Sequence, residues 1–375
     1  MFSGGIPIGR FFGIAVKLHW SWFIIFFLIT WMLATDYFPS VKEYQDWSTA
    51  TRWVIGFVTS ILFFSSVLAH ELAHSLVAKS AGLKVTAITL FIFGGVSQLT
   101  EEPKSPGEEF RMAVAGPGTS LVIGGACWGI FFATRHSVSP LTGITFWLGY
   151  INVALAAFNM IPGFPLDGGR VLRSILWWRS QNLRGATRIA SVIGRGIGYL
   201  FIFGGIALIF TPYWSNGLWL ALIGWILENA AVGSYRQVAI QDILRGHKVS
   251  EVMTRDCQAV TADLTVEQLV NDYILTSGRR CFPVVDYGRA LGLVTMHNIR
   301  VVERKLWARR TVREIMTPID RVKQVRPDDD LSSVMHLITE EDVNQVPVVE
   351  DNNIVGMVAR DNLLSFIHLR GELGM

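Results

Sequence analysis

The stretch "WVIGFVTSILFFSSVLAHELAHSLVAK", residues 53–79, joins an uncharged apolar run to a group of ionisable side chains. Residues 53–69 carry no charge and suit a helix that crosses a bilayer, whereas the next residues include His70, Glu71 and His74. An ionisable side chain inside a membrane is costly and normally faces a cavity within the protein. The stretch therefore predicts a membrane-spanning helix with a polar site near one end.

The HExxH spacing of these side chains predicts a metal site. Residues four apart lie on one face of a helix, so His70 and His74 can ligate one Zn²⁺ together. Glu71 is then placed to take a proton from the attacking water. Two alternatives stay open from the sequence: a chance match, and a polar helix end at the membrane surface.

A third metal ligand is expected in "FNMIPGFPLDGGRVLRS", residues 158–174. Pro162 and Pro165 exclude a continuous helix, so the carboxylate of Asp167 can turn inward to a metal. The alternative is that Asp167 caps the helix that follows. Asn159, the other polar residue of this run, is a candidate to bind a substrate backbone or a developing oxyanion, or to make a bond between helices.

Two further features are interpreted structurally. Gly116, in "AVAGPGTS", is predicted to allow close packing of helices, with direct substrate contact as the alternative. His19 lies beside tryptophans and is interpreted as an interfacial anchor outside the metal site.

Composition predicts a multi-span membrane domain followed by a cytosolic module. Charged residues make up 17% of the 375-residue chain, against about 25% in soluble domains, and the deficit ends near Arg236. We therefore assign residues 1–238 to a transmembrane domain and 239–248 to a linker. About six spans are expected, at roughly 18–38, 53–78, 110–134, 141–162, 189–210 and 215–236.

Lysines and arginines concentrate in alternate loops, which predicts a plasma-membrane protein with both termini in the cytoplasm. No cleaved signal peptide is evident. The net charge is +3 without a basic cluster, so no nucleic-acid partner is expected. The three cysteines form no CxxC pair.

The segment "LKVTAITLFIFGGVSQL", residues 83–99, is rich in β-branched and aromatic residues and is broken by Gly94 and Gly95. It predicts a β-hairpin or short sheet. Non-helical backbone at membrane depth survives only where it is buried or lines a cavity, so we expect it to form a cavity wall.

The uncharged run 196–227 is too long for one span and short for two. Arg195 and Glu228 should therefore lie inside the membrane at similar depth, where we expect them to pair. The alternative is that each reaches the interface separately by snorkelling.

An internal repeat follows the membrane domain. "VSEVMTRDCQAVTADLTVEQLV" is echoed by "VREIMTPIDRVKQVRPDDDLSSVM" at an offset of about 63–65 residues. Each unit is expected to contain helix, strand, helix, strand, strand and helix in that order. The units are assigned to residues 249–310 and 311–375.

Together these features resemble the site-2 protease family of intramembrane zinc metalloproteases, in the prokaryotic branch that carries a CBS pair. The resemblance rests on HExxH at 70–74, the Gly94-Gly95 hairpin, "NMIPGFPLDGG" at 159–169 and the repeat. It implies one Zn²⁺ held by His70, His74 and Asp167, with Glu71 as catalytic base. It also implies that Asn159 and the Gly94-Gly95 strand hold a transmembrane substrate for regulated intramembrane proteolysis.

CBS pairs resemble adenine-nucleotide sensors that hold ribose with a hydroxyl and, three residues on, an acid or amide. Thr295 and Asn298 keep this pattern, whereas Ala359 lacks the hydroxyl beside Asn362. We therefore expect at most one ATP or AMP site per CBS pair. The alternative is a module that serves only in homodimerisation.

Two rival functions remain open from the sequence. One is a transporter or channel gated by the CBS pair, although only one broken segment is evident in the membrane half. The other is a catalytically inactive membrane scaffold, against which the intact HExxH and Asp167 argue.

Overall fold

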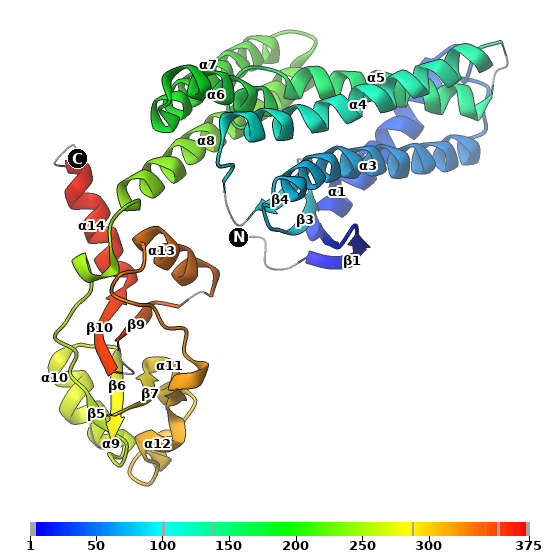
Figure 1. The fold of residues 1–375 in the computed structure, drawn as a ribbon. Helices are drawn as coiled ribbons and strands as arrows, with labels where there is room; N and C mark the ends of the chain where they lie inside the picture. The colour runs from blue at the N-terminus through cyan, green and yellow to red at the C-terminus, as the bar shows by residue number, and fades with distance from the viewer. Residues whose placement is uncertain are drawn as a thin grey trace. The chain divides into compact units, whose positions relative to one another are not determined.

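A computed structural model describes residues 5–92, 94–99, 102–136, 139–286, 289–341, 343–350 and 353–372 (Figure 1). The chain divides into two compact units, Met1–Arg236 and Gln237–Met375.

The first unit is predominantly helical, and its described residues include six helical segments that are long and apolar enough to cross a membrane. The first of these consists of α1 (Trp20–Met32), a π-helical turn (Leu33–Tyr37) and α2 (Phe38–Ser40). The expected six-span architecture is therefore confirmed. The other five segments are α3 (Thr49–Ser80), α4 (Pro106–Thr134), α5 (Pro140–Asn159), α7 (Leu183–Ile209) and α8 (Trp214–Leu244).

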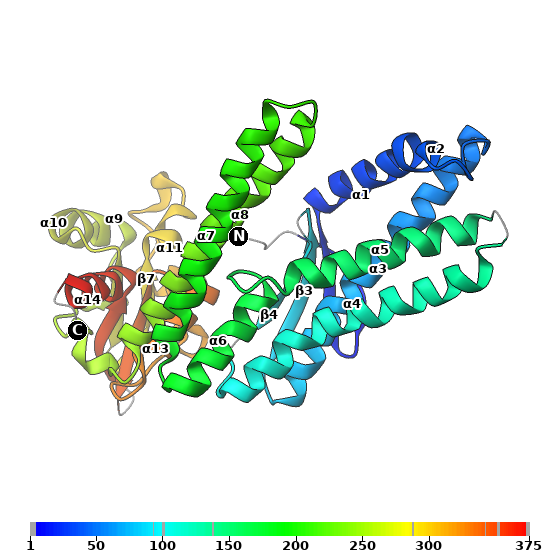
Figure 2. The ribbon, with the colours of Figure 1, turned by 90° about the horizontal axis from the view of Figure 1, so that it is seen from above.

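Helix α3 packs against α4, and α4 packs against α5 and the shorter helix α6 (Asp167–Ser180) (Figure 2). The turn before α6 is crowded. A Cβ at Gly168 would meet the Met160 carbonyl, and one at Gly169 would meet the backbone of Gly163 and Phe164. Small residues are therefore required where the chain doubles back after α5 and brings α6 against α4.

A four-stranded sheet lies beside α3. Its order is β1 (Gly5–Phe11), β2 (Ile14–His19), β3 (Val85–Phe91) and β4 (Gly94–Leu99), with β2 and β3 parallel and the other pairs antiparallel. The expected hairpin is thus confirmed as β3–β4. The sequence analysis missed β1 and β2, and it began the first span at residue 18, within β2. Strand β4 is an edge of the sheet.

A buried ion pair joins α6 to α4. Arg173 donates from Nε to Glu109 Oε1 at 2.6 Å, and its Nη2 also contacts that oxygen. The side chain of Glu109 is 0% exposed and that of Arg173 is 5% exposed. The guanidinium also lies over the Phe164 ring, 5.0 Å from its centroid, so Arg173 ties the turn before α6 to α4.

Arg173→Met should lower the free energy of unfolding by about 3–5 kcal/mol, because it leaves the Glu109 carboxylate buried without its partner. Thermal unfolding in detergent micelles would measure the loss. Arg179→Met, at an exposed position of the same helix, is the control. The double variant Arg173→Met/Glu109→Met should recover most of the stability, and a double variant as unstable as the single one would contradict this account.

Helices α7 and α8 approach closely through glycines. A Cβ at Gly198 would lie 2.9 Å from the Gly224 carbonyl oxygen, and one at Gly224 would lie 2.6 Å from that of Gly198. At one end of this contact, Arg195 Nε donates to Glu228 Oε1 at 3.3 Å, and the Tyr199 hydroxyl donates to the same oxygen at 3.3 Å. The expected pairing of Arg195 with Glu228 is confirmed.

The second unit consists of two repeats that exchange strands. Strand β8 of the second repeat pairs with β7 of the first, and Thr254 of the first bridges to Met357 of the second. The expected helix and strand order is observed in both repeats. Residues 239–244, expected in a linker, are the end of α8. The first repeat contains a 3₁₀ helix (Val249–Glu251), β5 (Val260–Thr261), α9 (Val266–Gln268), a π-helical segment (Leu269–Ile274), α10 (Leu275–Ser277), β6 (Cys281–Asp286), β7 (Arg289–Thr295) and α11 (Met296–Arg300). The second contains α12 (Val312–Ile315), β8 (Thr317–Pro318), α13 (Leu331–Glu340), β9 (Gln345–Glu350), β10 (Asn353–Ala359) and α14 (Arg360–Glu372).

The cysteines of this unit are free thiols. Burial raises the pKa of the Cys281 thiol to about 12, and the neighbouring Cys257 adds to the rise. Cys281 therefore stays protonated at neutral pH and is a poor nucleophile.

Candidate metal centre

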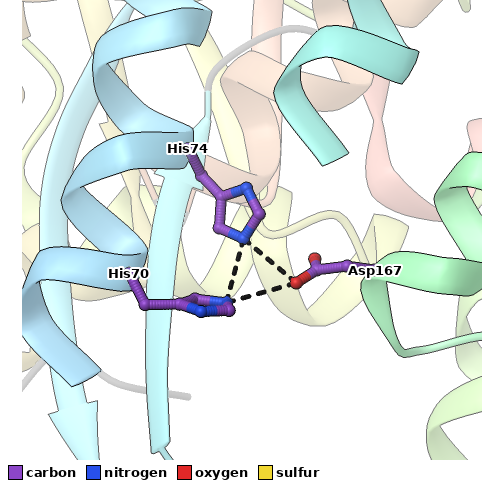
Figure 3. A group of neighbouring side chains, drawn as sticks. All are labelled: His70, His74 and Asp167. Carbon is purple, nitrogen blue, oxygen red and sulfur yellow. Dashed lines mark hydrogen bonds and ion pairs between the residues drawn. The ribbon is translucent and has the colours of Figure 1, made fainter. Parts of the chain in front are cut away.

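Three side chains that are far apart in the sequence converge in the first unit (Figure 3). His70 and His74 project from one face of α3, and Asp167 reaches them from α6. His70 Nε2 lies 3.2 Å from Asp167 Oδ2, and His74 Nε2 lies 3.1 Å from the same oxygen. The two Nε2 atoms are 3.2 Å apart. The structure thus brings together the three residues that were expected to ligate a metal.

The remaining ring nitrogens have partners on α4. His74 Nδ1 lies 2.7 Å from the Met112 carbonyl oxygen, and His70 Nδ1 lies 2.9 Å from Ser120 Oγ. A carbonyl oxygen only accepts hydrogen bonds, so Nδ1 of His74 must carry the proton. In the neutral ring, Nε2 of His74 then presents a lone pair to the shared point, as a metal-ligating histidine does.

The donor set fits Zn²⁺. Two imidazole nitrogens and one carboxylate oxygen, with a fourth position left open, are the ligands of a catalytic zinc site. With zinc–ligand bonds of about 2.0–2.1 Å, a tetrahedron separates its ligand atoms by roughly 3.3–3.5 Å, close to the three distances here. Electron-rich atoms so close together require a cation or a proton between them.

Asp167 is the first residue of α6, and Leu166 is the N-cap residue, without a side-chain cap. The carboxylate oxygen Oδ2 faces the two histidines, whereas the amides of Gly169 and Arg170 in the first turn donate to the Leu166 carbonyl oxygen. The geometry therefore favours metal ligation over the alternative that Asp167 caps the helix. A carboxylate in the first turn is also favoured by the helix dipole.

Glu71 lies about 100° around α3 from His70 and faces strand β4. Ser97 of β4 donates to Glu71 Oε2 at 3.2 Å, and Ser75 lies 3.0 Å from the Ser97 hydroxyl. A Cβ on Gly95 would lie 3.0 Å from Glu71 Cδ and closer still to Cγ. Strand β4 therefore leaves space for the Glu71 side chain and also fixes its carboxylate.

A cavity of about 270 Å³ joins these parts. Gly94 and Gly95 of β4 line it, as does Asn159, whose Nδ2 donates to the Leu155 carbonyl oxygen at 3.0 Å within its own helix. Its Oδ1 makes no hydrogen bond within the described residues. The cavity also contains Arg170, which sequence reasoning did not single out. The signal in the sequence that could have found Arg170 is its spacing of three residues from Asp167, which is about one helical turn.

Gly116 of α4 lies directly beside the two histidines. A Cβ there would lie 2.6 Å from Nε2 of His70 and closer still to Nε2 of His74. The prediction that Gly116 serves helix packing was therefore incomplete, because its missing side chain leaves room for the imidazoles. His19 lies outside this group, where its Nδ1 accepts from Ser21 N at the start of α1.

In the second unit, Thr295 and Asn298 bond to each other. Asn298 Oδ1 accepts from Thr295 N at 2.9 Å and from its hydroxyl at 2.6 Å, which forms a capping box at α11. Asn298 Nδ2 donates to Thr317 Oγ1 at 3.3 Å. In the second repeat, the only described group that donates to Asn362 is the Ala359 amide, at 3.0 Å. The asymmetry between the repeats is thus visible as a missing hydrogen bond.

Comparison with known proteins places this geometry in a family. Peptidase family M50 matches residues 58–142 and 133–203, and the CBS domain matches residues 249–304 and 312–369. "Zinc metalloprotease MJ0392" of Methanocaldococcus jannaschii is 30% identical over 98% of both chains. "Putative zinc metalloprotease Rip3" of Mycobacterium tuberculosis is 33% identical over 96% of this chain and 92% of its own.

Among solved structures, the site-2 protease of Methanocaldococcus jannaschii is 28% identical. It covers 62% of this chain and 95% of that chain, with a TM-score of 0.43. The full-length matches decide the assignment, because they extend over both the membrane unit and the repeats. The chain belongs to peptidase family M50, the site-2 protease family of zinc metalloproteases, and it carries a pair of CBS domains.

Proposed function

We propose that the protein is an intramembrane zinc endopeptidase that cleaves transmembrane segments of membrane-tethered proteins, as in regulated intramembrane proteolysis. The observation that carries the proposal is the convergence of His70, His74 and Asp167 beside Glu71, in a cavity among helices long enough to span a membrane. Hydrocarbon supplies no water, so hydrolysis there needs a polar cavity inside the protein.

Each residue of the cavity has its own role in the proposed reaction. A Zn²⁺ held by His70, His74 and Asp167 supplies Lewis-acid polarisation of the scissile carbonyl and acidifies the attacking water. Glu71 takes a proton from this water and passes it to the leaving nitrogen. The Ser97 hydroxyl holds the Glu71 carboxylate toward the cavity during both transfers.

Substrate binding is assigned to the edge strand β4. A helical substrate hides its carbonyls in internal hydrogen bonds, and addition as a further strand beside β4 would unwind and present it. Gly94 and Gly95 give such a strand close access, and the free Oδ1 of Asn159 can accept a substrate N–H. The bonded Nδ2 makes Asn159 a backbone-binding residue rather than the oxyanion donor.

The protein is a multi-pass membrane protein, and we assign it to the plasma membrane with both termini in the cytoplasm. Support comes from the loops that would then be cytoplasmic, which carry most of the lysines and arginines of the first unit.

The experiment that tests the function uses purified protein in lipid nanodiscs with a labelled transmembrane substrate. We expect one zinc ion per chain by elemental analysis, and cleavage that is lost with a chelator and restored by Zn²⁺. Stoichiometric zinc without cleavage of any substrate in a broad panel would instead favour the inactive scaffold. Ion flux through reconstituted protein, without cleavage, would favour the transporter.

We assign the CBS pair a regulatory role, which it would fulfil by forming a homodimer and by binding an adenine nucleotide. Thr295 and Asn298 are the candidate ribose-binding residues, although their mutual bond means that a ligand must compete with the capping box.

Titration of ATP and AMP into the full-length protein should show at most one nucleotide per chain. Thr295→Ala should weaken binding by about 2- to 13-fold, the value of one hydrogen bond. Thr311→Ala removes the hydroxyl from a matched capping box at α12 and serves as the control. Two equivalent sites would refute the asymmetry, and no binding at millimolar nucleotide would leave dimerisation as the role.

A further inference from the structure

Arg170 lies in the cavity wall with its hydrogen-bonding capacity unused. It is half-buried in the first turn of α6, three residues after Asp167. Within the described part of the chain, its guanidinium makes no hydrogen bond and no ion pair. A guanidinium carries five N–H donors and stays charged at any physiological pH. Such a group in a cavity wall is suited to bind an anion.

The other side-chain donors that line the cavity are already engaged. Nε2 of each histidine faces the metal-binding point, as described above. The hydroxyls of Ser75 and Ser97 bond to Glu71, and Asn159 donates to the Leu155 carbonyl. Among the described lining residues, Arg170 is therefore the charged donor that remains for a substrate.

The charge of Arg170 is balanced from a distance rather than by contact. Glu109 is within electrostatic reach of Arg170, but its carboxylate bonds directly to Arg173. Arg173 also lies 3.7 Å from Glu102. The two arginines and two glutamates sum to zero, which makes the cationic group tolerable in the membrane unit. The planar fork of Arg170 stays available for two carboxylate oxygens.

Building on the proposed function, we propose that Arg170 binds the anionic oxygens produced at the cleaved peptide bond. Water adds to the carbonyl carbon, the C–N bond breaks, and a proton passes through Glu71 to the leaving amine nitrogen. The second water proton leaves the new carboxyl group and protonates this amine, so the products are a carboxylate and an ammonium group. Negative charge develops on the carbonyl oxygen during this step and remains as the carboxylate of the new C-terminus. Arg170 contacts substrate in this role and is a catalytic residue.

The test compares Arg170→Met with wild type and with Arg179→Met, an exposed arginine of the same helix. Loss of one oxyanion donor typically lowers kcat by about 10²–10³-fold, and we expect such a fall with little change in KM. Zinc content, measured separately, should stay at the wild-type value.

A binding measurement gives a readout that a structural effect would not change. After mass spectrometry has located the cut, the N-terminal product peptide is made with a free carboxylate and with a carboxamide. Zinc-loaded wild type should prefer the carboxylate, and in Arg170→Met this preference should fall by about 13- to 160-fold, the value of one hydrogen bond to a charged group. Arg179→Met should keep it.

An unchanged carboxylate preference in Arg170→Met would overturn the proposal, even with reduced kcat, because the fall would then reflect altered structure. Wild-type kcat in Arg170→Met would overturn it as well. If wild type itself cleaves nothing, the failure belongs to the proposed function instead.

Discussion

Glu71→Gln leaves one zinc ion per chain and lowers the rate of cleavage by about 10²–10⁴-fold, the usual contribution of a general base. The reason is geometric. Glu71 bonds to Ser97 of β4, whereas the three ligand atoms lie together, within 4.8 Å of one another, beside it in the same cavity. Glutamine keeps the size of the side chain and its bond to Ser97 but cannot accept the proton.

The matched control is His74→Ala, which removes a ligand and should abolish both zinc binding and cleavage. Metal content by elemental analysis and initial rates on the same transmembrane substrate separate the two variants. Glu71→Gln with a wild-type rate would show that the proton passes through another group. Glu71→Gln without zinc would show that Glu71 ligates the metal.

The spans and the ligand set were accessible to sequence reasoning because each rests on local chemistry. Uncharged runs of about 20 residues indicate membrane spans, and HExxH places two imidazoles on one helical face whatever the other helices do. Asp167 could be found because two prolines break its segment. Arg195 and Glu228 could be paired because the turn between them sets their depth.

The partners of these residues could not be predicted because they lie on other elements. Ser120 and the Met112 carbonyl meet the histidines only after α4 packs on α3, and nothing in their local sequence marks them. Strands β1 and β2 join the sheet through a parallel contact with β3, about 70 residues further along the chain. The alternation in "IAVKLH", residues 14–19, is a signal that a stricter search could have used.

Gly116→Ala adds one methyl group beside the metal site, and it should weaken zinc binding while the fold stays intact. A Cβ at this position would lie 2.6 Å from His70 Nε2 and closer to His74 Nε2, far inside any normal contact. The added Cβ would clash with the ends of two side chains and not with backbone. The imidazoles can therefore rotate away while the helices stay packed. Because the displaced nitrogens are the ligand atoms themselves, Gly116→Ala should weaken zinc binding by about 100-fold, the upper end of the effect of residues that support metal ligands.

Gly118→Ala provides the matched control, because it adds the same methyl group two residues along α4, where a Cβ would meet nothing within 4 Å. Alanine is the better helix former by about 0.5–1 kcal/mol, so this variant should be as stable as wild type or more so. Competition with a zinc chelator measures affinity, and thermal unfolding of the metal-free proteins measures the fold. Wild-type zinc affinity in Gly116→Ala would place the metal elsewhere, whereas equal loss in both glycine variants would attribute the effect to α4 as a whole. We expect zinc affinity to fall in Gly116→Ala and not in Gly118→Ala. Such a contrast would show that Gly116 belongs to the metal centre because its missing side chain leaves room for the ligands.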